Sequence, residues 1–246
     1  MQSSGSSTTT TEIEFSVAKK QDNCPIYQTN GNPITYRPSR KQIRKEEVEG
    51  VPGAFLLHNV LSADECQQFI DLTERMGYGD APISTFGGMR MMPDVRNNQR
   101  VMWAAGEETL NPIWERIKEF IPAEEEAMGA TWNPYGLNNR FRFYRYDSQQ
   151  LFNRHYDGCY PRSRNDLSLL TLIIYLNDGV KGGSTTFFPS RNKEVEVTPK
   201  QGTALLFWHG PHKLSPEHEG SMVYKGRKYA MRSDVMFRTD FRPPTK

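Results

Sequence analysis

The sequence has little of what proteins of membranes or of the cell exterior require. Its 246 residues include three cysteines, Cys24, Cys66 and Cys159, and this odd, widely spaced set does not suggest a disulfide framework. No apolar run approaches the ~18 residues of a transmembrane helix, and the first residues lack the basic and apolar parts of a secretory signal. We therefore expect a protein of the cytoplasm or the nucleus, with no membrane partner.

An excess of charge of either sign is also missing. The chain has 31 Lys and Arg against 29 Asp and Glu, a formal net charge of +2, and no basic run interleaved with aromatic residues. Binding to nucleic acid needs clustered positive charge, so the composition argues against a nucleic-acid partner. Hydrophobic residues make up 36% and charged residues 24% of the chain, which is typical of a globular protein.

The chain divides by composition into a polar segment and a folded part. Residues 1–47 are polar and lack apolar periodicity, so we expect a flexible tail with one short strand at 13–17. The remainder, 48–246, is expected to form a single domain. Within it, helices and a loop at 48–130 support a β core at 131–240.

Two helices and one irregular segment are expected in the supporting part. Ser62 with Glu65 three residues later has the pattern of a capping box, and Gly77 is a typical helix end. Asn111-Pro112 indicates the start of a second helix with an apolar stripe. Between them, residues 79–100 are rich in Gly, Met, Pro and Asn, which is typical of a functional loop or lid.

Short strands dominate the second half of the chain. Residues 140–146 alternate as a half-buried strand does, whereas 169–176 are continuously apolar, as in a strand buried on both faces. Many short strands separated by turn residues predict a mainly β fold with a jelly-roll core, with the helices packed on one outer face. The other expected strands are 53–58, 182–189, 195–197, 204–208 and 229–237.

One pair of side chains suggests a metal site. His155 and Asp157 are separated by one residue, so on a strand or its continuation both point to one face. A second histidine folding back to this pair would give two imidazoles and one carboxylate on one side of a metal, the arrangement of non-haem Fe(II) oxygenases. The triplet alone fits a strand end followed by a turn equally well.

The residues around this pair carry a specific resemblance. From about residue 139 to 238 the chain resembles the 2-oxoglutarate- and Fe(II)-dependent oxygenases, and within them the prolyl 4-hydroxylase-like branch. The fold implied is a double-stranded β-helix, or jelly roll, supported by N-terminal helices. The matching pieces, in family order, are Tyr146, His155 with Asp157, Tyr175-Leu176, Gly182-Gly183 with Thr185, Phe188-Pro189, Gly202 to Trp208, His218 with Val223, and Gly226-Arg-Lys228.

The resemblance implies roles for these residues. His155, Asp157 and His218 would hold Fe(II) and form the catalytic centre. Lys228 would pair with the far carboxylate of 2-oxoglutarate, because a buried unpaired charge is costly. Tyr146, Tyr175 and Thr185 would line the same pocket. The implied cofactors are Fe(II), 2-oxoglutarate as co-substrate and O2, and the branch also suggests L-ascorbic acid.

Two of these assignments have alternatives. His209 and His212 also lie downstream and either could be the second imidazole, but only His218 has the family's following Val and Lys at matching distances. Arg232 comes four residues after Lys228 on the same expected strand. It could share or replace the role of the lysine, since a guanidinium binds a carboxylate through two hydrogen bonds.

The implied reaction is hydroxylation of a C–H bond with release of succinate and CO2. The resemblance favours a protein or peptide substrate, with prolyl hydroxylation first. The alternatives are a dioxygenase that oxidises a small molecule or a nucleic acid, and a non-catalytic jelly-roll binding domain. The chemistry is shared across the superfamily, so the metal site does not name the substrate.

One residue departs from the peptide-hydroxylating pattern. Such enzymes resemble one another in an Arg seven residues before the pocket tyrosine, and that position is Ser168 here. Arg162 and Arg164 could compensate from the preceding loop. Arg96 and Arg100, in the expected lid, could contact a polymer or an anion.

Overall fold

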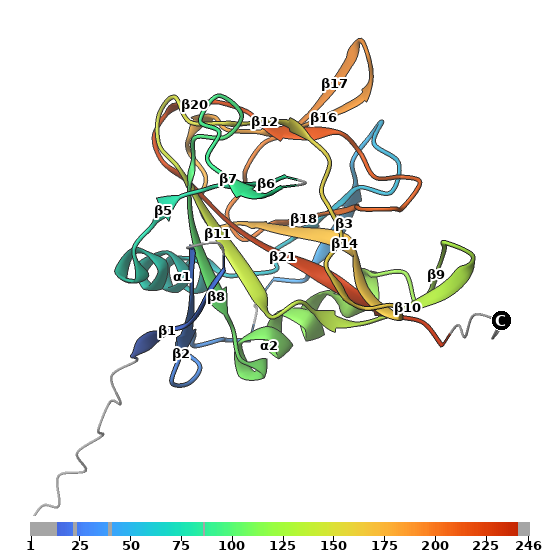
Figure 1. The fold of residues 1–246 in the computed structure, drawn as a ribbon, viewed down its shortest axis with the longest axis horizontal. Coiled ribbons are helices and arrows are strands. Elements are labelled where there is room, and N and C mark those ends of the chain that lie inside the picture. Colours follow the sequence, from blue (N-terminus) through green and yellow to red (C-terminus); the bar gives the residue numbers. More distant parts are fainter. Residues whose placement is uncertain (1–13, 22–23, 39–40, 86, 241–246) are drawn as a thin grey trace, which may run out of the picture.

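Two β-sheets form the body of the protein (Figure 1). The computed structural model describes residues 14–21, 24–38, 41–85 and 87–240. The larger sheet has thirteen strands, with the neighbour order β1-β2-β8-β11-β21-β14-β18-β4-β3 along its main path. In that order the strands are Phe15–Gln21, Cys24–Thr29, Gln99–Ala104, Arg140–Tyr146, Lys228–Arg238, Asp166–Tyr175, Ala204–Trp208, Phe55–His58 and Arg44–Glu47.

The smaller sheet has four strands in the order β12-β19-β16-β17. These are Phe152–His155, His218–Gly220, Thr185–Ser190 and Lys193–Val197. Four further strands, β5, β9, β10 and β13, complete the larger sheet, and two separate pairs form from β15 with β20 and β6 with β7. Their bounds are β5 Gly79–Asp80, β6 Ile83–Thr85, β7 Gly88–Arg90, β9 Glu125–Ala127, β10 Ala130–Leu137, β13 Pro161–Ser163, β15 Lys181–Gly182 and β20 Val223–Lys225.

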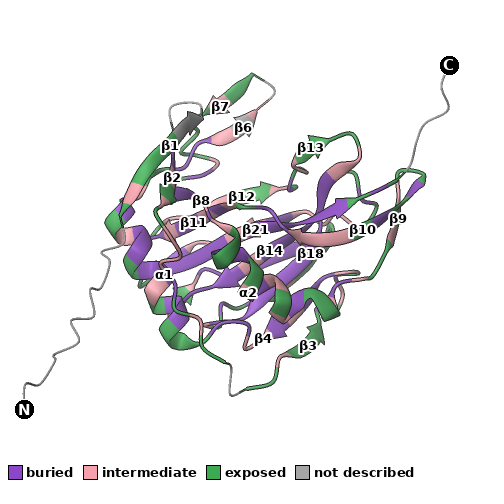
Figure 2. Ribbon diagram, turned by 90° about the horizontal axis from the view of Figure 1, so that it is seen from below, coloured by how far each residue is buried: buried purple, intermediate pink, exposed green. Residues whose placement is uncertain are grey.

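The two faces of the larger sheet differ in character because side chains alternate along its strands. On β11, Phe141 and Phe143 are fully buried on the outer face, where α1 (Ala63–Met76) and α2 (Glu107–Ile117) lie over the sheet (Figure 2). The ring of Phe69 in α1 lies 5.7 Å from that of Phe143. The alternate residues of β11 and β21 face the smaller sheet, so the polar side chains of these strands meet between the sheets.

The first helix begins and ends where the sequence predicts. Ser62 accepts a hydrogen bond from the Glu65 backbone N–H, and the Glu65 carboxylate accepts one from the Ser62 N–H, which completes the capping box. Gly77 follows the helix with a φ of 86°, a backbone conformation that favours glycine. Arg116 of α2 also pairs with Glu65 at 2.8 Å, so the cap ties the two helices together.

The second helix starts earlier than expected. The prediction placed its start at Asn111-Pro112, but α2 begins at Glu107 and contains Pro112. Proline has no N–H to donate to the carbonyl four residues back, that of Glu108. The side-chain amide of Asn32 donates to this carbonyl instead, at 3.2 Å. The helix therefore tolerates Pro112, because Asn32 from a distant segment donates the hydrogen bond that the Glu108 carbonyl would otherwise lack. A single 3-10 turn, η1 (Lys118–Phe120), follows.

The prediction of a flexible tail for residues 1–47 is wrong for the part that the structure describes. β1 and β2 form a hairpin, and β2 runs parallel to β8 at the edge of the larger sheet. Ile26 and Ile34 are buried there, and Tyr36 donates to the carbonyl of Thr109 in α2. A boundary at residue 47 therefore does not separate a tail from the domain. Residues 1–13, the start of the expected 13–17 strand among them, lie outside the described residues.

Most strands of the second half follow the prediction. β11 and β18 have the predicted bounds, and the expected 182–189 strand is divided into β15 and β16. Residues 79–100, expected as an irregular loop, contain β5, the β6–β7 hairpin and the first residues of β8. The fold is the mainly β jelly roll that the pattern predicted. In the described part of the chain, no helix combines the length and apolar character needed to cross a membrane.

Candidate metal centre

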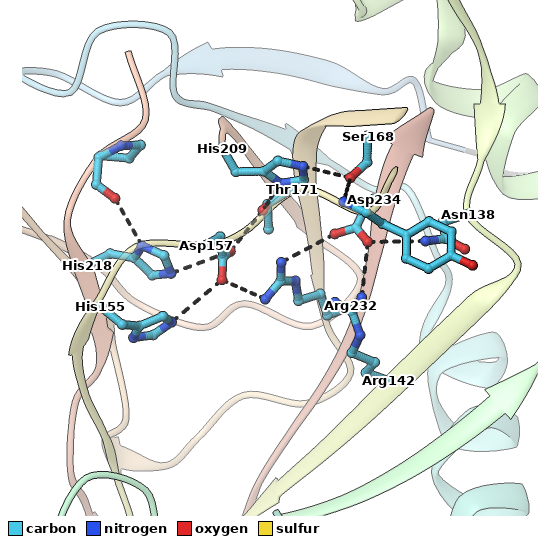
Figure 3. A network of polar contacts seen from close by, with 12 residues as sticks. Asn138, Arg142, His155, Asp157, Ser168, Thr171, His209, His218, Arg232 and Asp234 are labelled. Carbon is cyan, nitrogen blue, oxygen red and sulfur yellow. Dashed lines mark hydrogen bonds and ion pairs between the residues drawn. The ribbon is translucent and has the colours of Figure 1, made fainter. Parts of the chain in front are cut away.

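Neighbouring strands of the smaller sheet bring two histidines together. β12 and β19 are antiparallel, and His155 and His218 are Cα partners in their register. Asp157 follows two residues after His155, where the chain has left β12. One ligand atom from each of the three lies within 4.8 Å of the others. Figure 3 shows both imidazoles directed at the Asp157 carboxylate. The sequence prediction of this trio agrees with the geometry.

The imidazoles are oriented for ligation by their own backbone. Nδ1 of His155 lies 2.8 Å from the carbonyl of Asn153, and Nδ1 of His218 lies 3.2 Å from that of Pro216. A carbonyl only accepts hydrogen bonds, so each Nδ1 carries the proton and each Nε2 presents a lone pair. Both Nε2 atoms are 3.6 Å from an Asp157 oxygen. Burial lowers the pKa of His218 to about 4, which keeps this imidazole neutral.

Asp157 is a buried carboxylate held by two donors. Arg232 Nη1 donates to Oδ1 at 2.6 Å, and the Thr171 hydroxyl donates to Oδ2 at 2.8 Å. Burial alone would raise the pKa of this carboxyl, but the charge of Arg232 holds it well below its usual range. The residue is 5% exposed and yet ionised, so it supplies a fixed negative charge beside the two imidazoles.

The two other downstream histidines are engaged elsewhere. His209 Nε2 lies 2.8 Å from the Ser168 hydroxyl, and its Nδ1 lies 2.7 Å from that of Thr171. His212 contacts Glu125 through Nε2 and accepts from the Leu214 N–H at Nδ1. Both ring nitrogens of each residue are therefore occupied, and only His218 joins His155 and Asp157.

A chain of hydrogen bonds, all donated in one direction, runs from Ser168 through His209 and Thr171 to Asp157. The Thr171 hydroxyl donates to Asp157, so it accepts from Nδ1–H of His209, and the remaining Nε2 accepts from Ser168. Burial lowers the pKa of His209, in keeping with the single ring proton that this direction requires. Sequence reasoning missed Thr171 and the role of His209. The apolar run around Thr171 gave one signal, since a hydroxyl buried in a central strand needs a partner.

Lys228 lines a pocket together with the three metal-ligand candidates. Its side chain is 3% exposed, and Nζ donates to the Gly183 carbonyl at 2.6 Å. The rings of Tyr146 and Tyr175 lie 5.1 and 5.6 Å from Nζ, and the Tyr175 hydroxyl donates to Thr185 at 2.8 Å. Burial lowers the pKa of Lys228 to about 7. The predicted cofactor residues therefore surround one buried cation.

Arg232 faces the same pocket as Lys228, as strand alternation predicts. Its guanidinium is bound to two carboxylates, Asp157 at 2.6 Å and Asp234 at 3.3 Å. Burial would lower its pKa, but the two carboxylates raise it. Arg232 therefore lies at the metal-centre end of the pocket, on the Asp157 carboxylate. A role for Arg232 beside the co-substrate carboxylate stays a prediction.

Comparison with known proteins identifies the family. The model of the 2OG-Fe(II) oxygenase superfamily matches residues 141–233, the segment that holds all three clustered side chains and Lys228. The match supports the 2OG-Fe(II) oxygenase superfamily for this segment. The chain is 25% identical to prolyl 4-hydroxylase 1 of Arabidopsis thaliana over 206 residues, covering 76% of this chain and 70% of that protein. It is also 25% identical to a putative prolyl 4-hydroxylase of Acanthamoeba polyphaga mimivirus, covering 71% and 70%.

Solved structures show the same fold. The viral collagen prolyl hydroxylase of Paramecium bursaria Chlorella virus-1 superposes with a TM-score of 0.51 at 22% identity, covering 81% of this chain and 97% of that one. A prolyl hydroxylase of Trichoplax adhaerens gives 0.54 at 18% identity, covering 74% and 83%. These solved structures show the jelly-roll fold. The family model and the curated relatives support an oxidoreductase of the prolyl 4-hydroxylase-like branch, in a superfamily that uses Fe(II), 2-oxoglutarate and O2.

Proposed function

We propose that the protein is a 2-oxoglutarate-dependent dioxygenase that hydroxylates prolyl residues in a protein or peptide. The observation that carries the proposal is one pocket with two different ends. At one end are the three converging ligand atoms of His155, Asp157 and His218, and at the other is the buried cation of Lys228.

The donor set fits an Fe(II) ion. Two neutral imidazoles and one carboxylate on one face leave other coordination positions open, as non-haem Fe(II) oxygenases require. We propose His155, Asp157 and His218 as the iron ligands. Bound Fe(II), with 2-oxoglutarate and O2, supplies the oxidising chemistry that replaces C–H by C–OH and releases succinate and CO2.

Lys228 fits the second requirement, a counter-charge for the co-substrate. Within the described ranges, the Lys228 ammonium has a carbonyl, that of Gly183, and no carboxylate as its hydrogen-bond partner. Burying a charge in this way is costly, and a carboxylate placed beside it would relieve that cost by a charge-assisted hydrogen bond. Tyr146, Tyr175 and Thr185 exclude water from this end of the pocket. We propose that these residues hold the far carboxylate of 2-oxoglutarate.

The protein's other contribution is to hold Asp157 in place. Arg232 and Thr171 bind one oxygen each, which fixes the plane of the carboxylate. Partners that orient a ligand in this way commonly change metal affinity by about 10- to 100-fold when they are removed. We propose that both act as positioning residues.

The substrate is inferred from the relatives. Those named above are prolyl hydroxylases, so we propose a prolyl residue in a protein or peptide. Ser168 does not argue against a peptide, because in this chain it bonds His209 and the backbone of Tyr160. A small molecule as substrate is the alternative.

The test is iron-dependent succinate production, with the product read by mass spectrometry. We expect turnover with Fe(II) and 2-oxoglutarate, stimulated by proline-containing peptides that gain 16 mass units, at a rate of about 1–1000 per second. If small molecules stimulated succinate production and none of the peptides did, a small-molecule substrate would be favoured. The absence of any Fe(II)-dependent turnover would contradict the proposed function. Ascorbate stays a prediction, which the same assay tests with and without it.

A further inference from the structure

A second hollow opens beside the candidate metal centre. It shares Tyr144, Phe152, His155, Asp157 and Arg232 with the pocket that contains Lys228, and it extends from them toward β8 and the β6–β7 hairpin. We call it the arginine groove. A substrate that places a carbon near the three metal-ligand candidates would have to lie along it.

Strand alternation lines this groove with positive charge. On β11, Arg142 is the Cα partner of Arg232 on β21, and Tyr144 is the partner of Arg100 on β8. These residues therefore share the face of the larger sheet that looks toward the metal centre. Five arginines line the groove: Arg96, Arg100, Arg140, Arg142 and Arg232.

Arginines outnumber carboxylates among the residues that line the groove. Asp157 is the one carboxylate among the residues that line the groove. Asp234 lies behind it and pairs with Arg142 and Arg232, each at 3.3 Å. Arg142 and Arg232 are directly opposed on neighbouring strands, and the shared Asp234 offsets the repulsion expected between like charges at such positions. The arginines together also act on a neighbouring group: although burial opposes ionisation, Arg96, Arg232, Arg142 and Arg100 lower the pKa of Tyr144 to about 8.

The buried guanidinium of Arg96 has a free hydrogen-bond donor in the described part of the protein. It is 5% exposed, with its guanidinium 4.5 Å from the Tyr144 ring and 4.3 Å from that of Phe152. Nε donates to Asn98 at 2.6 Å, but Nη2 is buried and has no hydrogen-bond partner among the described residues. A buried donor without a partner is costly, and an acceptor on a ligand in the groove would satisfy it.

The opposite wall of the groove is apolar. Pro82, Ile83 and Met89, around the β6–β7 hairpin, line it. A ligand that fits both walls has an apolar part and an anionic group, and an acidic residue next to a proline offers both. Arginine binds carboxylates through paired hydrogen bonds.

We propose that the arginine groove binds a carboxylate of the substrate, supplied by an acidic residue next to the prolyl residue that is hydroxylated. This inference rests on the proposed function for the identity of the modified residue. It goes further in naming the substrate class, an acidic peptide. A small carboxylic acid offers the same chemistry and is distinguished by the experiment.

The experiment measures binding separately from catalysis. Three fluorescent peptides differ only beside a single proline, as Glu-Pro-Glu, Gln-Pro-Gln and Lys-Pro-Lys, and their affinities are measured by anisotropy without added metal. We expect Glu-Pro-Glu to bind about tenfold or more tightly than Gln-Pro-Gln, the scale of a charged hydrogen bond, and Lys-Pro-Lys to bind most weakly. If unlabelled N-acetyl-L-proline displaced the fluorescent peptide and unlabelled Glu-Pro-Glu peptide did not, the carboxylate bound in the groove would be that of a small acid.

Matched variants locate the effect. Arg100→Gln with Arg140→Gln should remove the preference for Glu-Pro-Glu, and Arg100→Glu with Arg140→Glu should reverse it toward Lys-Pro-Lys. The control pair, Arg75→Gln with Arg191→Gln, makes the same charge change at exposed positions outside the groove lining and should keep the preference. Thermal melts confirm that each variant is folded.

Two results would overturn the proposal: equal binding of the three peptides, or an unchanged preference in the Arg100 and Arg140 variants. Failure of the proposed function looks different. In that case no peptide is hydroxylated, although acidic peptides still bind. If proline peptides are hydroxylated without regard to flanking charge, the proposed function stands and the groove assignment is wrong.

Discussion

Two pairs of histidines in one half of the chain differ in a single respect. In His209 and His212, both ring nitrogens have side-chain or backbone partners. In His155 and His218, one nitrogen is bound to a carbonyl and the other faces a carboxylate 3.6 Å away. Three of the four are buried, so burial does not separate the pairs. What separates them is the Nε2 lone pair, which in His155 and His218 accepts no hydrogen bond from any described residue. These two histidines are therefore the ones that can hold a metal.

The pairs are also connected. The Thr171 hydroxyl forms hydrogen bonds with both His209 and Asp157 (Figure 3). His209 is not a metal-ligand candidate itself, but through this hydroxyl it helps to orient one, the Asp157 carboxylate. The predictions below separate ligation from support and are ordered by the size of the expected effect.

The largest effect is expected from His218→Ala. This change removes one of the three ligand atoms, so Fe(II)-dependent succinate production should fall to the level measured without iron. His212→Ala is the matched control, because its ring contacts Glu125 and lies outside the cluster. Loss of turnover in His212→Ala with turnover kept in His218→Ala would reverse the assignment.

Lys228→Met comes next. Methionine keeps the length of the side chain but removes the charge, so we expect KM for 2-oxoglutarate to rise about 10- to 100-fold, the range for a hydrogen bond to a charged group. Succinate production at saturating co-substrate should be much less affected. An unchanged KM would show that the far carboxylate binds elsewhere.

The same lysine predicts a pH dependence. Burial lowers its pKa to about 7, so below pH 7 the free protein already carries the charge that a carboxylate needs. Above pH 7 a proton must be taken up on binding, and affinity for 2-oxoglutarate should fall about tenfold per pH unit. Calorimetry with Mn(II) as a redox-inactive metal checks this. Lys228→Arg, which stays charged, should give a flat profile; a flat profile in the wild type would contradict the prediction.

The smallest effect is expected from Thr171→Val. The substitution keeps the shape but removes the hydroxyl between Asp157 and His209, so the iron affinity should fall about tenfold. Thr171→Ser should restore it, whereas a role in packing alone would favour valine over serine. Equal iron affinity in all three proteins would remove Thr171 from the site.

The sequence predicted what is local or what the family resemblance supplied. The capping box at Ser62 and the strand from Arg140 to Tyr146 depend on neighbours along the chain, and both have the predicted form. The trio of metal-ligand candidates rested on the resemblance, because no local pattern distinguishes His218 from His209. Hydrogen bonds to partners distant in the sequence decide that question.

What the sequence did not predict depends on distant partners. Residues 24–29 look like a tail because they carry little apolar surface, and pairing with β1 and with the distant β8 makes them a strand. Pro112 was taken as a helix start because the donor that replaces its N–H is on Asn32. Of the arginine groove, only the possible anion contacts of Arg96 and Arg100 were predicted, because its five arginines come from three strands and a loop.

The most direct test of the central claim is the stoichiometry of Fe(II) binding, measured by anaerobic calorimetric titration. The claim is that His155, Asp157 and His218, and neither His209 nor His212, hold the metal. We predict one Fe(II) per chain in the wild type and in His212→Ala, and no specific binding in Asp157→Ala or His218→Ala. One tightly bound Fe(II) per chain in Asp157→Ala and His218→Ala would contradict the account.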